Sequence, residues 1–137
     1  MRTLDEIAGD IKARIADEFP TVRFSTAGNS PQLINEIKAM SEAKLPAVVI
    51  VIDAGEVTDS KRKEVLNITL VLIDRFIAGS DERALSVWRN LARLRTLFPP
   101  DVTEINNVYY LPNRFYTAAG DPRYASFALE LEAHQGV

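Results

Sequence analysis

The fold of this chain is decided by two apolar runs, PAVVIVI at residues 46–52 and VLNITLVLI at residues 65–73. The second run alternates apolar and mixed positions, which is the period of a half-buried β-strand. The first run is apolar on both faces and rich in β-branched residues, which favours a strand covered from both sides. We therefore predict a long central β-hairpin over Leu45–Phe76. The chain's own helices can cover one face of this strand. A second subunit is a candidate cover for the other face.

A polar segment, Asp53–Glu64, is expected to connect the two strands as a long loop, and loops of that length are usually functional or mobile. In this segment three acids spaced by three residues, Asp53, Glu56 and Asp59, are followed by three basic residues, Lys61, Arg62 and Lys63. Such a loop would suit pairing between neighbouring copies around a ring, and a solvated loop tip is the ordinary alternative. The acids could also offer oxygens to a divalent ion, but they lack the spacing of an EF-hand, so no metal is assigned. The candidate interface residues of this loop are therefore Asp53, Glu56, Asp59, Lys61, Arg62 and Lys63.

Three amphipathic helices are expected around the hairpin. The first covers Thr3–Glu18, where Thr3 and Glu6 form a capping box, and the second covers Gln32–Ala43. The third begins after the cap Ser80 and runs to about Phe98. In the third helix we interpret Trp88 as a core residue that packs the helix onto the sheet. Arg89 and Arg93 are expected on its outer face, either solvated or facing an acidic partner surface.

Further strands are expected on both sides of the hairpin. A short edge strand is predicted over Val22–Thr26 and an alternating strand over Tyr124–Ala133, with Leu129 and Leu131 among its inward residues. Two segments rich in Tyr, Val and Phe, Ile105–Leu111 and Arg114–Ala118, lie between them. The predicted order is therefore α, β, α, β, β, α, β, β. At 137 residues this suits one domain over the whole chain, residues 1–137.

Composition narrows the classes of protein to consider. A net charge of -3 and a pI near 5.2 argue against a dedicated nucleic-acid binder. The chain has no cysteine, which excludes disulfides, thiolate metal sites and a cysteine nucleophile. The N-terminus has acids within its first ten residues and no apolar run of signal-peptide length, and no run approaches the ~20 residues of a membrane span. We expect a cytoplasmic protein without a membrane segment.

Residue types that carry catalysis are sparse. The only histidine, His134, lies three residues from the C-terminus, where we expect fraying and no catalytic role. With one histidine and no cysteine, a nucleophilic triad would need an unusual variant. The six glycines are scattered, and they form neither a dinucleotide fingerprint nor a P-loop. We therefore assign no catalytic residue and no cofactor.

Five segments together carry a resemblance to a known family. They are TLDEIAGDIKARIADEFP, LPAVVIVIDAG, KEVLNITLVLID, DERALSVWRNLARLRTLF and YASFALELEA. In their order, with the size and acidic pI, the chain resembles the tail terminator (tail completion) proteins of long-tailed bacteriophages and prophages, including the Mu-like branch. The resemblance implies an α+β fold with a single twisted, mostly antiparallel sheet and helices packed mainly on one face.

The resemblance also implies a function without catalysis. Such subunits assemble into a hexameric ring that caps the tail tube and joins it to the neck, in the host cytoplasm during assembly and in the virion afterwards. Its partners would be other copies of the chain, the tail tube protein and a neck or head-completion protein. Two alternatives stay open: a phage neck or head-completion protein, and a small cytoplasmic ligand-binding or enzymatic α+β domain. For the ring, the expected assembly interface comprises Asp53, Glu56, Asp59, Lys61, Arg62, Lys63, Arg89 and Arg93.

Overall fold

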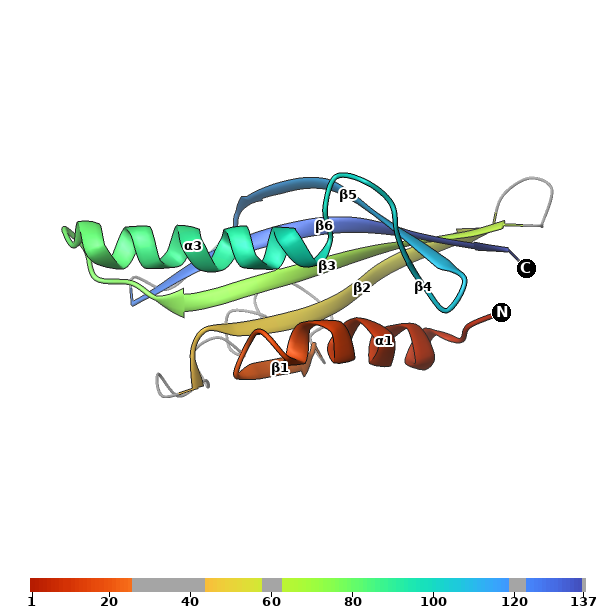
Figure 1. Ribbon diagram of the computed structural model, residues 1–137, viewed down its shortest axis with the longest axis horizontal. Coiled ribbons are helices and arrows are strands. Elements are labelled where there is room, and N and C mark those ends of the chain that lie inside the picture. Colours follow the sequence, from red (N-terminus) through yellow and green to blue (C-terminus); the bar gives the residue numbers. More distant parts are fainter. Residues whose placement is uncertain (26–43, 58–62, 119–122, 137) are drawn as a thin grey trace.

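The computed structural model describes residues 1–25, 44–57, 63–118 and 123–136. In these residues one six-stranded sheet has the order β1-β2-β3-β6-β5-β4, in which β1 and β2 pair in parallel and the other neighbours pair antiparallel. The two described helices lie lengthwise along the same face of the sheet (Figure 1). The predicted α+β class with one twisted, mostly antiparallel sheet is confirmed. The elements are α1 (Leu4–Ala16), β1 (Thr21–Phe24), β2 (Ala47–Val57), β3 (Lys63–Arg75), α3 (Asp81–Leu97), β4 (Thr103–Ile105), β5 (Val108–Thr117) and β6 (Tyr124–Gly136).

The central hairpin is confirmed and is longer than predicted. β2 and β3 pair from Ala47 opposite Ile73 to Val57 opposite Glu64, with a bulge between Ile52 and Ala54. The prediction of a loop over 53–64 is therefore wrong over most of its length, and only residues 58–62 lie outside the described part of the hairpin. The error has a physical cause. Ladder hydrogen bonds join backbone groups, so a strand can continue through polar side chains where the sheet leaves its core and meets water.

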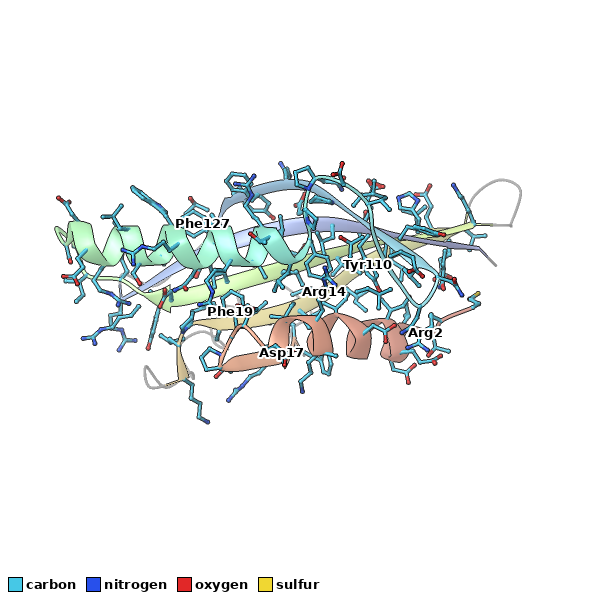
Figure 2. The ribbon with its side chains drawn as sticks, viewed as in Figure 1. Arg2, Arg14, Asp17, Phe19, Tyr110 and Phe127 are labelled. Atoms are coloured by element: carbon cyan, nitrogen blue, oxygen red, sulfur yellow. The ribbon has the colours of Figure 1, made fainter. Side chains whose placement is uncertain are left out.

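One face of the sheet carries the main core. Alternate residues of β2, β3, β5 and β6 point to this face, and both helices pack their apolar stripes against it. Arg14 ties the two helices together, because its Nε donates to the carbonyl oxygen of Leu97 at 2.6 Å (Figure 2). The buried residues of this core include Ile7, Ile11, Ile15, Val48, Ile50, Leu66, Ile68, Leu70, Leu72, Leu91, Leu94, Phe98, Tyr110, Leu129 and Leu131.

The opposite face of the sheet is divided into two parts. Near the start of β2, Ala47, Val49, Val71 and Ile73 are all buried and form a second cluster with Tyr124. Both faces of this part of β2 are thus covered within one chain, which confirms the two-sided strand. A second subunit is not needed as its cover there. Toward the far end of the hairpin the same face becomes polar and accessible to solvent, and we call that part the open face.

The orientation of α3 differs from the prediction at Trp88. Val87, Leu91 and Leu94 are buried as expected, but the Trp88 side chain is 57% exposed and is not a core residue. Trp88 lies about 100° around the helix from Val87, at the flank of the buried stripe. The opposite flank turns inward instead, because the Asn90 amide donates to the buried carboxylate of Asp74 at 2.7 Å.

The C-terminal strands give two further corrections. His134 does not fray: it lies within β6, is half-buried and pairs with Val65 and Tyr109 in the neighbouring strands. The strand β4 was not predicted. It joins β5 through Asn106 and Asn107, whose φ angles of 51° and 65° are the left-handed values of a two-residue hairpin turn. The predicted helix over 32–43 lies outside the described residues.

Candidate assembly surfaces

The residues predicted in the hairpin loop fall into two groups. Asp53 and Glu56 are exposed positions of β2, and Lys63 is the exposed first residue of β3. The Thr69 hydroxyl donates to the Asp53 carboxylate across the bulge. The other predicted loop residues, Asp59, Lys61 and Arg62, lie outside the described residues.

The two arginines predicted on α3 have different environments. Arg93 Nη2 donates to the carbonyl oxygen of Glu18 at 2.6 Å and to its carboxylate at 3.0 Å, and the guanidinium lies 5.3 Å from the ring centre of Phe19. Arg93 therefore joins α3 to the chain that follows α1. Arg89 is exposed and has no ion pair with any residue in the described segments.

An apolar and basic stripe runs along the solvent side of α3. Leu85 is 50% exposed and Trp88 is 57% exposed, and Arg89 stands one turn from Leu85 and next to Trp88. We call Leu85, Trp88 and Arg89 the outer stripe. α3 contains four arginines, and its two acids, Asp81 and Glu82, lie in its first turn. The stripe thus presents an indole and a guanidinium that follow the acidic first turn of the helix.

The open face of the sheet has the opposite charge. Carboxylates from three strands, β2, β4 and β6, reach it, while Arg114 and Lys63 supply positive charge. The Arg114 guanidinium donates two hydrogen bonds to the Glu130 carboxylate, from Nε at 2.7 Å and from Nη2 at 3.1 Å. His134 Nε2 lies 3.4 Å from the Glu132 carboxylate. The carboxylates of this face belong to Asp53, Glu56, Glu104, Glu130 and Glu132.

The Arg114 contact also tunes two titrating groups. The hydrogen bonds from Arg114 hold the pKa of the Glu130 carboxyl below its usual value, with a smaller contribution from Tyr116. Burial, together with a hydrogen bond to Glu130, raises the pKa of the Tyr116 phenol. At neutral pH the open face therefore keeps Glu130 ionised beside a neutral tyrosine.

An open cavity of about 420 Å³ lies on this face. Its polar lining combines carboxylate, amide and hydroxyl groups with one aromatic ring, and we call it the sheet cavity. The lining includes Asp53, Asn67, Thr69, Asn113, Tyr116 and Glu130.

A second polar cluster joins the two ends of the described chain. Arg2 donates to Asp10 through Nη2 at 2.7 Å and Nε at 3.1 Å, and to Glu6 through Nη1 at 2.9 Å (Figure 2). The Arg2 backbone N–H and C=O both bond to the side-chain amide of Gln135 at 2.9 Å. This cluster fastens the start of α1 to the end of β6, which is a structural role.

The described segments contain no group of three or more His, Cys, Asp or Glu side chains placed to hold a metal ion. None of their helices combines the length and apolar character needed to cross a membrane.

Sequence reasoning missed the surfaces that the fold brings together. The alternation predicted for the last strand, with Leu129 and Leu131 inward, puts Glu130 and Glu132 on the outward side, and that was the available signal. It gave no sign that Arg114 and Tyr116 would meet them, because strand pairing joins residues that are far apart in the chain. No protein-family model matches this chain, and no curated protein sequence matches it significantly.

Proposed function

We propose that this protein is a non-enzymatic structural subunit of a phage or prophage, a tail terminator whose copies form a ring on the end of the tail tube and join it to the neck. The order and pattern of its segments resemble that family. The α+β fold with both described helices on one face of the sheet has the architecture expected of such a subunit.

The outer stripe of α3 is the observation that carries the proposal. Tryptophan and arginine are enriched in the centres of protein interfaces and often dominate their binding energy. Trp88 and Leu85 are about half exposed on one helix, next to the exposed guanidinium of Arg89. A subunit that functions inside an assembly would cover such a stripe with a neighbour.

The proposed partners are further copies of the chain in a hexameric ring, the tail tube protein and a neck protein. Assembly would take place in the host cytoplasm, and the mature ring would belong to the virion. The ends of the hairpin strands, which carry Glu56 and Lys63, would face neighbouring subunits or the tube.

Light scattering after size-exclusion chromatography, together with negative-stain electron microscopy, tests the proposal. Purified protein is examined alone, and then with tail tubes and with capsids from the phage or prophage that encodes it. Rings in solution, or rings on tube ends, support a terminator. Binding to capsids alone would favour a neck or head-completion protein. A monomer that binds neither structure would contradict both assignments and leave a ligand-binding domain.

A further inference from the structure

We infer that the outer stripe of α3 in one copy docks into the sheet cavity of the next copy, head to tail. The inference rests on the proposed ring and specifies the contact that would build it. The occupant of each surface is a second copy of this chain.

The positions of the two surfaces require two different copies. The helices pack on one face of the sheet, and the outer stripe points away from that face. The sheet cavity belongs to the opposite face, where Thr69, Tyr116 and Glu130 alternate with core residues. One copy cannot bring its own two surfaces together. Contacts between unlike surfaces run head to tail and close into a ring when the rotation between copies allows it.

Charge makes the two surfaces complementary. α3 has four arginines and, in its first turn, the two acids Asp81 and Glu82. Arg83 pairs with Asp74 and Arg93 with Glu18, so the cation that the outer stripe itself offers to a partner is Arg89. The open face has five carboxylates and two basic side chains, Lys63 and Arg114, and Arg114 is already paired with Glu130. Complementary potentials fix the register of an interface and disfavour contacts between like surfaces. Contacts sheet to sheet between two copies are therefore disfavoured, and a contact of Arg89 with the carboxylates of the open face is attractive.

The chemistry of the cavity suits an indole. Tryptophan has one N–H donor and no acceptor, so its burial needs an acceptor and a surface on which to pack. The cavity offers the carboxylate oxygens of Asp53 and Glu130, and the ring of Tyr116 is 39% exposed at its wall. Its volume of about 420 Å³ leaves room for one aromatic side chain. With Trp88 seated there, we place the adjacent Arg89 opposite Glu132, which lies two residues along β6 from Glu130. The Glu132 side chain is 32% exposed, and its carboxylate lies 3.4 Å from His134 Nε2.

Charge reversal tests the contact in the full-length protein. Arg89→Glu and Glu132→Lys should each weaken assembly about tenfold or more, because each places like charges across the contact. The double variant Arg89→Glu/Glu132→Lys should assemble nearly as well as the original chain, because the pair is restored with its signs exchanged. Asp17→Lys is the matched control: it makes the same change of charge as Glu132→Lys, at an exposed position on neither surface (Figure 2).

Trp88 supplies an independent readout because it is the only tryptophan. Its emission should shift to shorter wavelength as the concentration rises through the assembly transition measured by light scattering. If the chain assembles only on tail tubes, the same variants are scored by counting tube-bound rings.

The outcomes separate the contact from the proposed function. If the original chain assembles while its Trp88 emission stays unchanged, this contact is wrong but the ring stands. The same holds if the original chain assembles and the double variant assembles no better than the single variants. A chain that neither forms rings nor binds tubes would overturn the ring itself. Loss of assembly in the single variants, with recovery in the double variant, supports both.

Discussion

Removing the carboxylate of Asp74 should destabilise the protein through one hydrogen-bond network beneath α3. Asp74 is 3% exposed on the core face of β3 and accepts a hydrogen bond from Asn90 at 2.7 Å. Arg83 Nη2 lies 3.5 Å from the same carboxylate and donates to the carbonyl oxygen of Arg75 at 2.9 Å. Asp74→Ala would leave the Asn90 amide, and part of the Arg83 guanidinium, without their acceptor.

The structure sets the expected size of this effect. Removing one partner of a buried charged pair costs about 3–5 kcal/mol, and a hydrogen bond to a charged group is worth about 1.5–3 kcal/mol. The side chain of Arg83 is 29% exposed and keeps a second acceptor, so water can replace part of the loss. We expect about 3 kcal/mol for Asp74→Ala and about 1–2 kcal/mol for Asn90→Ala. The double variant should cost little more than Asp74→Ala, a coupling of about 1–2 kcal/mol.

Urea unfolding followed by far-ultraviolet circular dichroism measures these free energies, provided that the slope with denaturant is unchanged. Asp101→Ala, at an exposed position, is the control and should stay within about 0.5 kcal/mol of the original chain. A cost below about 1 kcal/mol for Asp74→Ala would refute the reasoning. Additive effects of the two substitutions would also do so, because independent sites do not couple.

Three further predictions concern other parts of the fold. Burial raises the pKa of Tyr110 above its usual 10.0, so the stability linked to its neutral form is complete below pH 10 and is lost at higher pH. Its hydroxyl has no partner in the described residues, so Tyr110→Phe should change the stability at pH 7 by less than about 1 kcal/mol and reduce the alkaline loss in urea titrations. Arg114 lowers the pKa of Glu130 below 4.5, so this contribution is complete above pH 4.5 and is lost as the pH falls through the folded value. Glu130→Gln should therefore make the acid limb of stability shallower, and an unchanged limb would contradict the pairing. Gly9→Ala within α1 has open space around its Cβ and should raise the free energy of unfolding by about 0.5–1 kcal/mol. Gly79→Ala, at φ +80°, should lower it by about 1 kcal/mol, and the reverse order in thermal melts would contradict both glycine assignments.

Much of the fold could be predicted because its signals are local. The alternation of Leu66, Ile68, Leu70 and Leu72 is a property of one strand, and the same four residues form part of the buried core. The capping box of Thr3 and Glu6 is equally local, and the structure contains both of its hydrogen bonds. The extent of the hairpin was not predictable in this way, because its outer part is held by backbone pairing between polar residues.

The candidate surfaces depend on contacts between distant residues, which no local pattern contains. The sheet cavity needs the four neighbouring strands β2, β3, β6 and β5, so its lining comes from residues that are more than 70 positions apart, such as Asp53 and Glu130. Trp88 was misplaced for a related reason. Helical periodicity gave a stripe broad enough to include it, and the buried partner that turns the helix away from it, Asp74, lies on another element.

The exposure of Trp88 is therefore tied to a polar group inside the core. A helix free to maximise apolar burial would roll toward its indole, which offers more apolar area than any other side chain of α3. Such a roll would withdraw Asn90 from Asp74 and leave a buried carboxylate short of a donor, and this cost opposes the gain from burying part of the ring. The Asp74 network thus favours the observed orientation of α3, which buries Val87 and Leu94 and leaves Leu85, Trp88 and Arg89 outside. The same contact that stabilises the subunit also presents the surface through which we propose that it assembles.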